Sequence, residues 1–187
     1  LAILGQGGFG TVYRALDTRM QRLCAIKENL DPSPEGARQF EKEALILGQL
    51  SHPSLPRVSD HFVISGQGQY LVMDYIKGED LRDRMDRIGI LPDNEIITIG
   101  IAICEALYYL HTRRPPVLHR DIKPANVLLT VKNGRVCAVL GDFGTACREG
   151  KNKKGAGSPK YTPDVLQTIF YQKDTRHTEH RRDRYAW

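Results

Sequence analysis

A short polar stretch between two apolar segments carries the groups that could do chemistry. Five polar side chains fall within eight residues, and these are His119, Arg120, Asp121, Lys123 and Asn126. Asp121 could accept a proton, Lys123 could neutralise a phosphate, and Asn126 could offer a neutral oxygen to a metal ion. If the apolar residues 117–118 and 127–129 form buried strands, they would hold the loop rigidly. A polar turn without a function is the alternative interpretation.

A further carboxylate follows 21 residues after Asp121, in Asp142-Phe143-Gly144. The apolar segments 127–129 and 136–140 precede it, and Asn133-Gly134 between them is a strong signal for a tight hairpin turn. The triplet is a weak signal alone, but its place behind this hairpin and the polar loop makes it a candidate site element.

A glycine-rich turn lies near the start of the chain, in Gly5-Gln6-Gly7-Gly8-Phe9-Gly10. Glycines let backbone N–H groups approach a phosphate without obstruction by a Cβ atom. Dinucleotide-binding proteins carry a similar pattern, but there a helix follows the glycines. Here the β-branched residues Thr11 and Val12 follow, which favours a second strand. A purely structural hairpin is the remaining alternative.

The segment 24–27 predicts a strand in which Ala25 and Lys27 share one face, because side chains alternate along a strand. A lysine at the end of a strand is usually solvated. In this sequence, however, the next predicted element carries a carboxylate that would suit it as a partner.

That element is a helix, which Ser33-Pro34-Glu35 predicts to begin with a capping hydroxyl and a proline in the first turn. Its apolar face is marked by Phe40, Ala44 and Leu47, and Glu43 lies within that face. Burying an unpaired carboxylate is costly, so a pair with the strand lysine is expected. A Glu43 exposed at the rim is the alternative.

In type and in order, these motifs resemble those of the protein kinase family. The pattern GxGxxGxV, a strand lysine, a helix glutamate, the loop from His119 to Asn126 and the triplet at Asp142 all have counterparts there. The lysine two residues after Asp121 resembles the catalytic loop of serine/threonine kinases. The residues of the glycine-rich turn and of the loop resemble those of bacterial, eukaryotic-like kinases.

The resemblance implies transfer of the γ-phosphoryl group of ATP to a Ser or Thr hydroxyl of a protein substrate, with Mg²⁺. The implied catalytic residues are Asp121 as the base, Lys123, Lys27 and Glu43. The implied metal ligands are Asn126 and Asp142.

The same resemblance implies how the nucleotide is held. The backbones of Asp74 and Ile76 would pair with the adenine edge, Met73 would guard the back of the pocket, and Leu128 would close it from below. The full implied set is Gly5, Gln6, Gly7, Gly8, Phe9, Gly10, Val12, Ala25, Lys27, Met73, Asp74, Ile76 and Leu128.

The expected fold is α+β and bilobal. Residues 1–76 would form a small antiparallel β lobe with one helix, truncated at its start. Residues 77–164 would form part of a mainly helical large lobe, with a helix over 93–112 and an activation segment over 145–161. Residues 165–187 are expected to be a basic, weakly kinase-like tail, which leaves the large lobe incomplete.

Charge and composition narrow the remaining possibilities. Residues 1–147 carry 17 basic and 17 acidic side chains, so the net charge of +5 lies in the last forty residues. A basic end could bind nucleic acid or an anionic membrane, but a solvated end is the simpler interpretation, and no nucleic-acid partner is expected. No run of eighteen apolar residues and no signal peptide is visible, and the four cysteines are scattered, which favours a cytoplasmic protein.

Two other functions stay open at this stage. The chain could bind ATP without turnover, as a pseudokinase-like regulatory module, although every chemical residue of the family is present. It could also be an unstable remnant that exposes apolar surface. The sequence does not predict the oligomeric state or the identity of the protein substrate.

Overall fold

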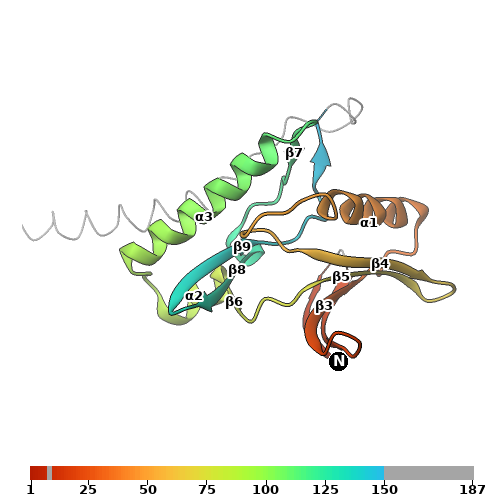
Figure 1. The fold of residues 1–187 in the computed structure, drawn as a ribbon, viewed down its shortest axis with the longest axis horizontal. Coiled ribbons are helices and arrows are strands. Elements are labelled where there is room, and N and C mark those ends of the chain that lie inside the picture. The colour runs from red at the N-terminus through yellow and green to blue at the C-terminus, as the bar shows by residue number, and fades with distance from the viewer. Residues whose placement is uncertain (8–9, 150–187) are drawn as a thin grey trace, which may run out of the picture.

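The computed structural model describes residues 1–7 and 10–149. Its fold has two parts that follow one another in sequence, and each part contains β-sheet and helix (Figure 1). The expected α+β class is confirmed. The first part is a five-stranded antiparallel sheet in the order β1-β2-β3-β5-β4 with one helix. Its elements are β1 (Ala2–Gly7), β2 (Gly10–Asp17), β3 (Arg22–Glu28), α1 (Pro34–Leu47), β4 (Val58–Ile64) and β5 (Gly68–Asp74).

Helix α1 begins where the sequence predicts. The Ser33 hydroxyl accepts a hydrogen bond from the Gly36 N–H at 3.0 Å, which satisfies one of the unpaired donors of the first turn. The helix packs against β4 and β5 and buries Phe40 and Leu47. Glu43 lies on this buried face with only 3 % of its surface exposed. The amphipathic pattern therefore places a carboxylate against the sheet.

The second part follows β5 and contains two α-helices and two small sheets. Its elements are β6 (Gly78–Asp80), α2 (Leu81–Ile88), α3 (Asp93–His111), β7 (Val117–Leu118), the 3-10 turn Pro124–Asn126, β8 (Val127–Lys132), β9 (Arg135–Leu140) and β10 (Cys147–Arg148). Strands β6, β8 and β9 form one sheet in that order, and β7 pairs with β10.

The hairpin β8–β9 turns at the predicted dipeptide. Asn133 and Gly134 adopt φ values of 51° and 72°, the left-handed conformation that a two-residue hairpin of this type requires at both positions. Behind the hairpin, α3 packs against β9 and buries Ile99, Ile103 and Leu110. The loop 119–126 is thus held between β7 and β8, as expected.

Helix α2 was not predicted. The Asp80 carboxylate caps it by accepting a hydrogen bond from the Asp83 N–H at 2.9 Å, and Leu81 is its one buried residue. Its apolar residues Leu81, Met85 and Ile88 recur at a helical spacing, so a short amphipathic signal was present in the sequence. Leu81 and Met85 pack with the core.

Gly8, Phe9 and residues 150–187, which include most of the expected activation segment and the basic tail, lie outside the residues that the structure describes. Among residues 1–7 and 10–149, no helix combines the length and the apolar character that crossing a membrane would require.

Candidate active site

The predicted ion pair between strand β3 and helix α1 is present. The Lys27 ammonium lies 2.8 Å from Oε1 and 2.9 Å from Oε2 of Glu43. Both residues are buried, with 6 % and 3 % of their surfaces exposed. Burial raises the pKa of the Glu43 carboxyl, and the nearby Lys27 charge opposes that effect. Two charged groups are therefore buried together, and each compensates the charge of the other.

Lys27 also reaches the second part of the molecule. Its ammonium lies 3.4 Å from Oδ1 of Asp142, in the triplet that follows β9. Asp142 adopts a φ of 53°, an uncommon conformation for a residue with a side chain. The Gly144 N–H donates to the same Oδ1 at 3.3 Å, which holds the carboxylate toward Lys27. One cation thus joins two carboxylates from distant parts of the chain.

The polar loop has its own network, centred on Asp121. The Lys123 ammonium donates to Oδ2 of Asp121 at 2.8 Å, and this bond raises the pKa of Lys123. The Asn126 amide donates to the same Oδ2 at 3.0 Å and to the Asp121 carbonyl at 2.8 Å. These bonds orient Asp121 and use the side-chain nitrogen of Asn126, which leaves the side-chain amide oxygen of Asn126 and Oδ1 of Asp121 without a donor among the described residues.

His119 fixes the loop against the Asp142 segment. Its side chain is 1 % exposed and packs edge-on against Phe143, with the ring centroids 4.6 Å apart. Its Nε2 lies 2.9 Å from the Gly141 carbonyl oxygen, and its own carbonyl accepts from the Thr145 hydroxyl at 2.9 Å. Burial lowers the pKa of this imidazole, so the neutral form is favoured. His119 and Phe143 therefore pack the loop and the triplet against each other.

The proposed nucleotide-binding side chains of the first sheet share one face. Val12 lies opposite Lys27, and Met73 lies opposite Ala25, which is two residues from Lys27 on the same strand. Directly opposed residues of antiparallel strands point to the same side, and so do residues two apart. The structure therefore brings Val12, Ala25, Lys27 and Met73 to the face that also receives α1.

Glycine is required at one end of the glycine-rich turn and not at the other. Gly10 has a φ of 137°, and a Cβ atom there would lie 2.0 Å from the Glu28 carbonyl oxygen. At Gly5 a Cβ atom would meet nothing within 4 Å. The residues pair across the turn as Gly5 with Val12 and Gly7 with Gly10, so the β1–β2 hairpin forms as predicted.

The end of β5 and the connection to β6 contain Asp74 and Ile76, whose backbones the resemblance assigns to the adenine edge. The Asp74 N–H donates to the Arg57 carbonyl at 2.9 Å, so only the Asp74 carbonyl could serve a ligand there. No hydrogen bond within the described residues involves the backbone of Ile76. Leu128 lies on β8 opposite Asp80, one strand away from this connection.

The oxygen donors fit a magnesium ion only together with a ligand. No group of three or more His, Cys, Asp or Glu side chains within residues 1–7 and 10–149 could hold a metal. Asp142 and the Asn126 carbonyl oxygen are hard donors of the kind that Mg²⁺ prefers, and Mg²⁺ commonly binds through one or two carboxylates plus phosphate oxygens and water. The donor set therefore matches a metal carried by a nucleotide.

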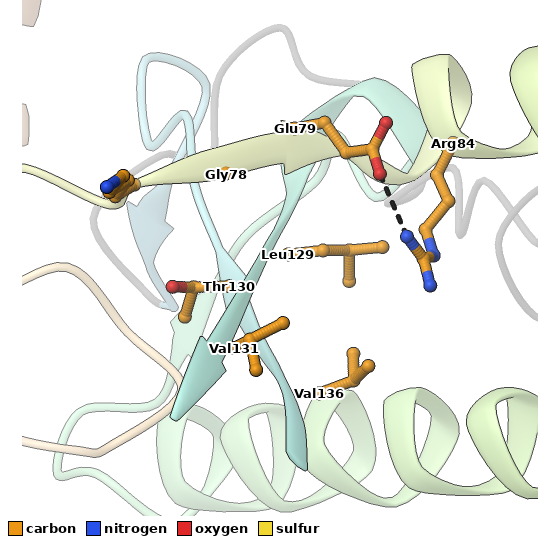
Figure 2. Close-up of a pocket in the computed structure, with 8 residues that line it drawn as sticks. Gly78, Glu79, Arg84, Leu129, Thr130, Val131 and Val136 are labelled. Atoms are coloured by element: carbon orange, nitrogen blue, oxygen red, sulfur yellow. Dashed lines mark hydrogen bonds and ion pairs between the residues drawn. The ribbon is translucent and has the colours of Figure 1, made fainter. Parts of the chain in front are cut away.

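A cavity of about 420 Å³ lies elsewhere, on the β6–β8–β9 sheet, and it is not this site (Figure 2). Leu129 and Val131 line it, whereas the neighbouring residue Leu128 points to the opposite face of the sheet. Glu79 and Arg84 close one side with an ion pair of 2.9 Å, drawn as a dashed line in Figure 2. The cavity therefore belongs to the junction of β6, β8 and α2.

Sequence reasoning missed two polar contacts around the site. The Gln39 side chain on α1 reaches the Gly144 carbonyl, and Arg84 joins Glu79 to Glu95. The position of Gln39 one turn before Glu43 was a signal for the first, because residues four apart share a helix face. The Arg84 contacts had no signal in the sequence, because Glu79 and Glu95 lie on different elements.

Comparison with known proteins agrees with this geometry. The family model described as the protein kinase domain matches residues 1–183. A "Probable serine/threonine-protein kinase" of Streptomyces coelicolor is 37% identical over 150 residues, covering 77% of this chain and 22% of its own length. A protein of the same description from Clostridium perfringens is 30% identical over 195 residues, covering 100% and 27%. A "Probable receptor-like protein kinase" of Arabidopsis thaliana is 35% identical over 178 residues, covering 89% and 26%. The chain spans roughly a quarter of the length of these curated relatives.

Proposed function

The chain belongs to the protein kinase family, and from this premise we propose that it transfers the γ-phosphoryl group of ATP to Ser or Thr hydroxyls of proteins. The observation that carries the proposal is the double contact of Lys27 with Glu43 and Asp142. It joins a cation suited to phosphates, a helix that positions it and a carboxylate suited to magnesium. The lysine two residues after Asp121 and the names of the relatives favour Ser and Thr as acceptors.

Asp121 is the proposed base. Its Oδ2 is occupied by Lys123 and Asn126, so Oδ1 is the oxygen that would accept the proton of the incoming hydroxyl. As the hydroxyl oxygen bonds to the γ-phosphorus, the bond from that phosphorus to the bridging oxygen of ADP breaks. Lys123 would then stabilise negative charge on the transferred group, because its ammonium is already held beside the carboxylate.

Asp142 and Asn126 would hold Mg²⁺ together with the nucleotide phosphates. When bound, the metal supplies charge neutralisation at the phosphate oxygens. Asp142 is 34 % exposed, so a ligand can reach it, and Lys27 and Gly144 already hold it in place. The Asn126 amide nitrogen is fixed on Asp121, which directs its carbonyl oxygen away from that residue.

The remaining contacts to ATP follow from the shared face of the first sheet. We assign the phosphate contacts to Lys27 and to the backbone of the turn 5–10, which includes Gly8 and Phe9. The adenine would lie between Val12 and Ala25 on one side and Leu128 on the other, with Met73 behind it. The carbonyl of Asp74 and the backbone of Ile76 would bind the adenine edge.

The proposal extends to organisation and location. We assign residues 1–76 to the small lobe, 77–164 to part of the large lobe and 165–187 to a basic tail. All four cysteines (Cys24, Cys104, Cys137 and Cys147) are free thiols, which supports a reducing compartment such as the cytoplasm.

The test is transfer of radiolabelled phosphate from Mg-ATP to a generic basic protein and to the chain itself, with thermal unfolding in parallel. Label that requires Asp121, as judged with the Asp121→Asn variant, would support the proposal. If no label appears while Mg-ATP still raises the melting temperature, the chain binds the nucleotide without transferring phosphate, and the kinase proposal is contradicted. Absence of both effects would contradict nucleotide binding as well as catalysis.

A further inference from the structure

Gln39 links helix α1 to the backbone of the Asp142-Phe143-Gly144 triplet through its side chain. Its Nε2 donates a hydrogen bond to the Gly144 carbonyl oxygen at 2.6 Å. The two residues are 105 positions apart in the chain, and Gln39 is half-buried at the contact. Local sequence therefore does not explain the contact, and the approach of α1 to the triplet does.

The same helix face carries Glu43, four residues later. Residues four apart lie above one another on a helix, so Gln39 and Glu43 point in the same direction. Glu43 binds Lys27, and Lys27 reaches Oδ1 of Asp142 at 3.4 Å. Gln39 reaches the same triplet by a separate route. The Glu43 carboxylate also accepts a hydrogen bond from the backbone of Phe143. Helix α1 thus holds the triplet through the Lys27 cation, through Glu43 and through Gln39.

Gly144 is held on both sides by these contacts. Its N–H donates to Oδ1 of Asp142 at 3.3 Å, and its carbonyl accepts from Gln39. A change in the orientation of Gly144 would therefore withdraw a donor from the Asp142 carboxylate. Asp142 itself has a φ of 53°, and a non-glycine residue persists in this conformation when its surroundings fix it. Gln39 is part of those surroundings.

From these contacts we infer that Gln39 is a positioning residue, which sets the orientation of the Asp142 carboxylate by fixing Gly144. The inference rests on the proposed function, because Asp142 is the proposed magnesium ligand. Gln39 does not touch the nucleotide or the reacting hydroxyl in this account. It acts through Gly144 and Asp142, and its loss should weaken the use of Mg²⁺ more than the binding of the adenine.

The experiment compares three variants of the chain with the wild type. Gln39→Leu removes the donor at a similar volume, and Gln39→His returns an N–H at a comparable distance from the backbone. Glu41→Leu is the matched control, because Glu41 is an exposed polar residue of the same helix. For each protein, the melting temperature is measured alone, with ATP and EDTA, and with ATP and MgCl₂, and the phosphate-transfer rate is measured against MgCl₂ concentration.

Gln39→Leu should lose most of the extra thermal stabilisation that MgCl₂ adds to ATP, while the stabilisation by ATP with EDTA remains. Its kcat should fall about tenfold, with a higher MgCl₂ concentration at half-maximal rate and a KM for ATP changed less than threefold. Gln39→His should recover much of both effects, and Glu41→Leu should match the wild type.

Two results would overturn the inference. One is a Gln39→Leu variant with the wild-type dependence on MgCl₂ in both measurements. The other is equal impairment of Gln39→Leu and Gln39→His, since a restored donor would then have no effect. If no protein transfers phosphate, the proposed enzyme is contradicted, and the thermal measurements still decide the role of Gln39. If ATP with MgCl₂ stabilises none of the proteins, the inference is contradicted together with the proposed function.

Discussion

The Lys27 ammonium and the Glu43 carboxylate lie 2.8 Å apart with both residues buried, so that strand β3 and helix α1 share one ion pair. Removing one partner of a buried pair leaves the other charge uncompensated. Replacing both partners by apolar residues removes that cost. The pair therefore allows stability and activity to be separated by mutation.

Lys27→Met should lower the free energy of unfolding by roughly 2–4 kcal/mol at pH 7, because Glu43 stays buried without its main cation. The double variant Lys27→Met with Glu43→Leu should recover most of that loss in urea unfolding. Both variants should transfer phosphate at least about 100-fold more slowly than the wild type, since a preorganised cation for the phosphates is gone. A double variant that transfers phosphate as fast as the wild type would contradict the proposed role of Lys27 in the active site.

The two ends of the glycine-rich turn should respond differently to a methyl group. Gly10→Ala places Cβ against the Glu28 carbonyl at a φ of 137° and should cost roughly 2 kcal/mol or more of stability. Gly5→Ala meets open space, so its melting temperature should stay close to that of the wild type. Its affinity for Mg-ATP should fall, because the methyl group occupies space proposed for phosphate. Thermal unfolding and calorimetric titration with Mg-ATP test both statements, and a Gly10→Ala variant as stable as the wild type would contradict the first.

Local patterns made most of the first sheet and helix α1 predictable. Ser33 caps α1 where expected, Asn133-Gly134 turns the β8–β9 hairpin, and the inward position of Glu43 indicated its partner. These features are encoded by residues close together in sequence, where backbone preference and apolar periodicity act.

Contacts that depend on distant elements were not predictable. Helix α2 is a different case, because its signals were local and were overlooked: Leu81, Met85 and Ile88 recur at a helical spacing, and Asp80 and Gly89 are capping residues. Strands β7 and β10 have two residues each and exist only because they pair with one another. The helical spacing of Gln39 and Glu43 indicates that they share a face, but the bond from Gln39 to Gly144 depends on the three-dimensional approach of α1 to the triplet.

His119 should make stability depend on pH. Burial lowers the pKa of its imidazole below the usual 6.5. Just below pH 6.5, the imidazole is therefore protonated in the unfolded chain but stays neutral in the folded chain. The stabilisation is therefore full above pH 6.5 and is lost as the pH falls toward the folded-state pKa, with a slope of at most about 1.4 kcal/mol per pH unit. Urea unfolding of the wild type and of His119→Gln between pH 5 and 8 measures it. The variant should show a shallower slope below pH 6.5, and equal slopes would contradict the assignment.

Arg84 should stabilise the junction of β6, α2 and α3. It bonds Glu79 at 2.9 Å and Glu95 through two nitrogens, one of them at 2.9 Å, and Glu95 is 8 % exposed. Arg84→Leu would leave the buried Glu95 carboxylate without its partner and should lower the free energy of unfolding by about 1–3 kcal/mol. Arg82→Leu, at an exposed position of the same helix, is the control and should have little effect in urea unfolding. Equal stability of the two variants would show that the Arg84 network contributes nothing.

The measurement that tests the account most directly is single-turnover transfer, with the chain in excess over radiolabelled Mg-ATP and a Ser- and Thr-containing protein as acceptor. Wild type and Asp121→Asn are compared after titration shows that both bind Mg-ATP. If Asp121 is the base, label should appear on Ser or Thr at least about 100-fold faster with the wild type than with the variant. Equal rates, or no label from a wild type that binds Mg-ATP, would contradict Asp121 as the base and the chain as a kinase.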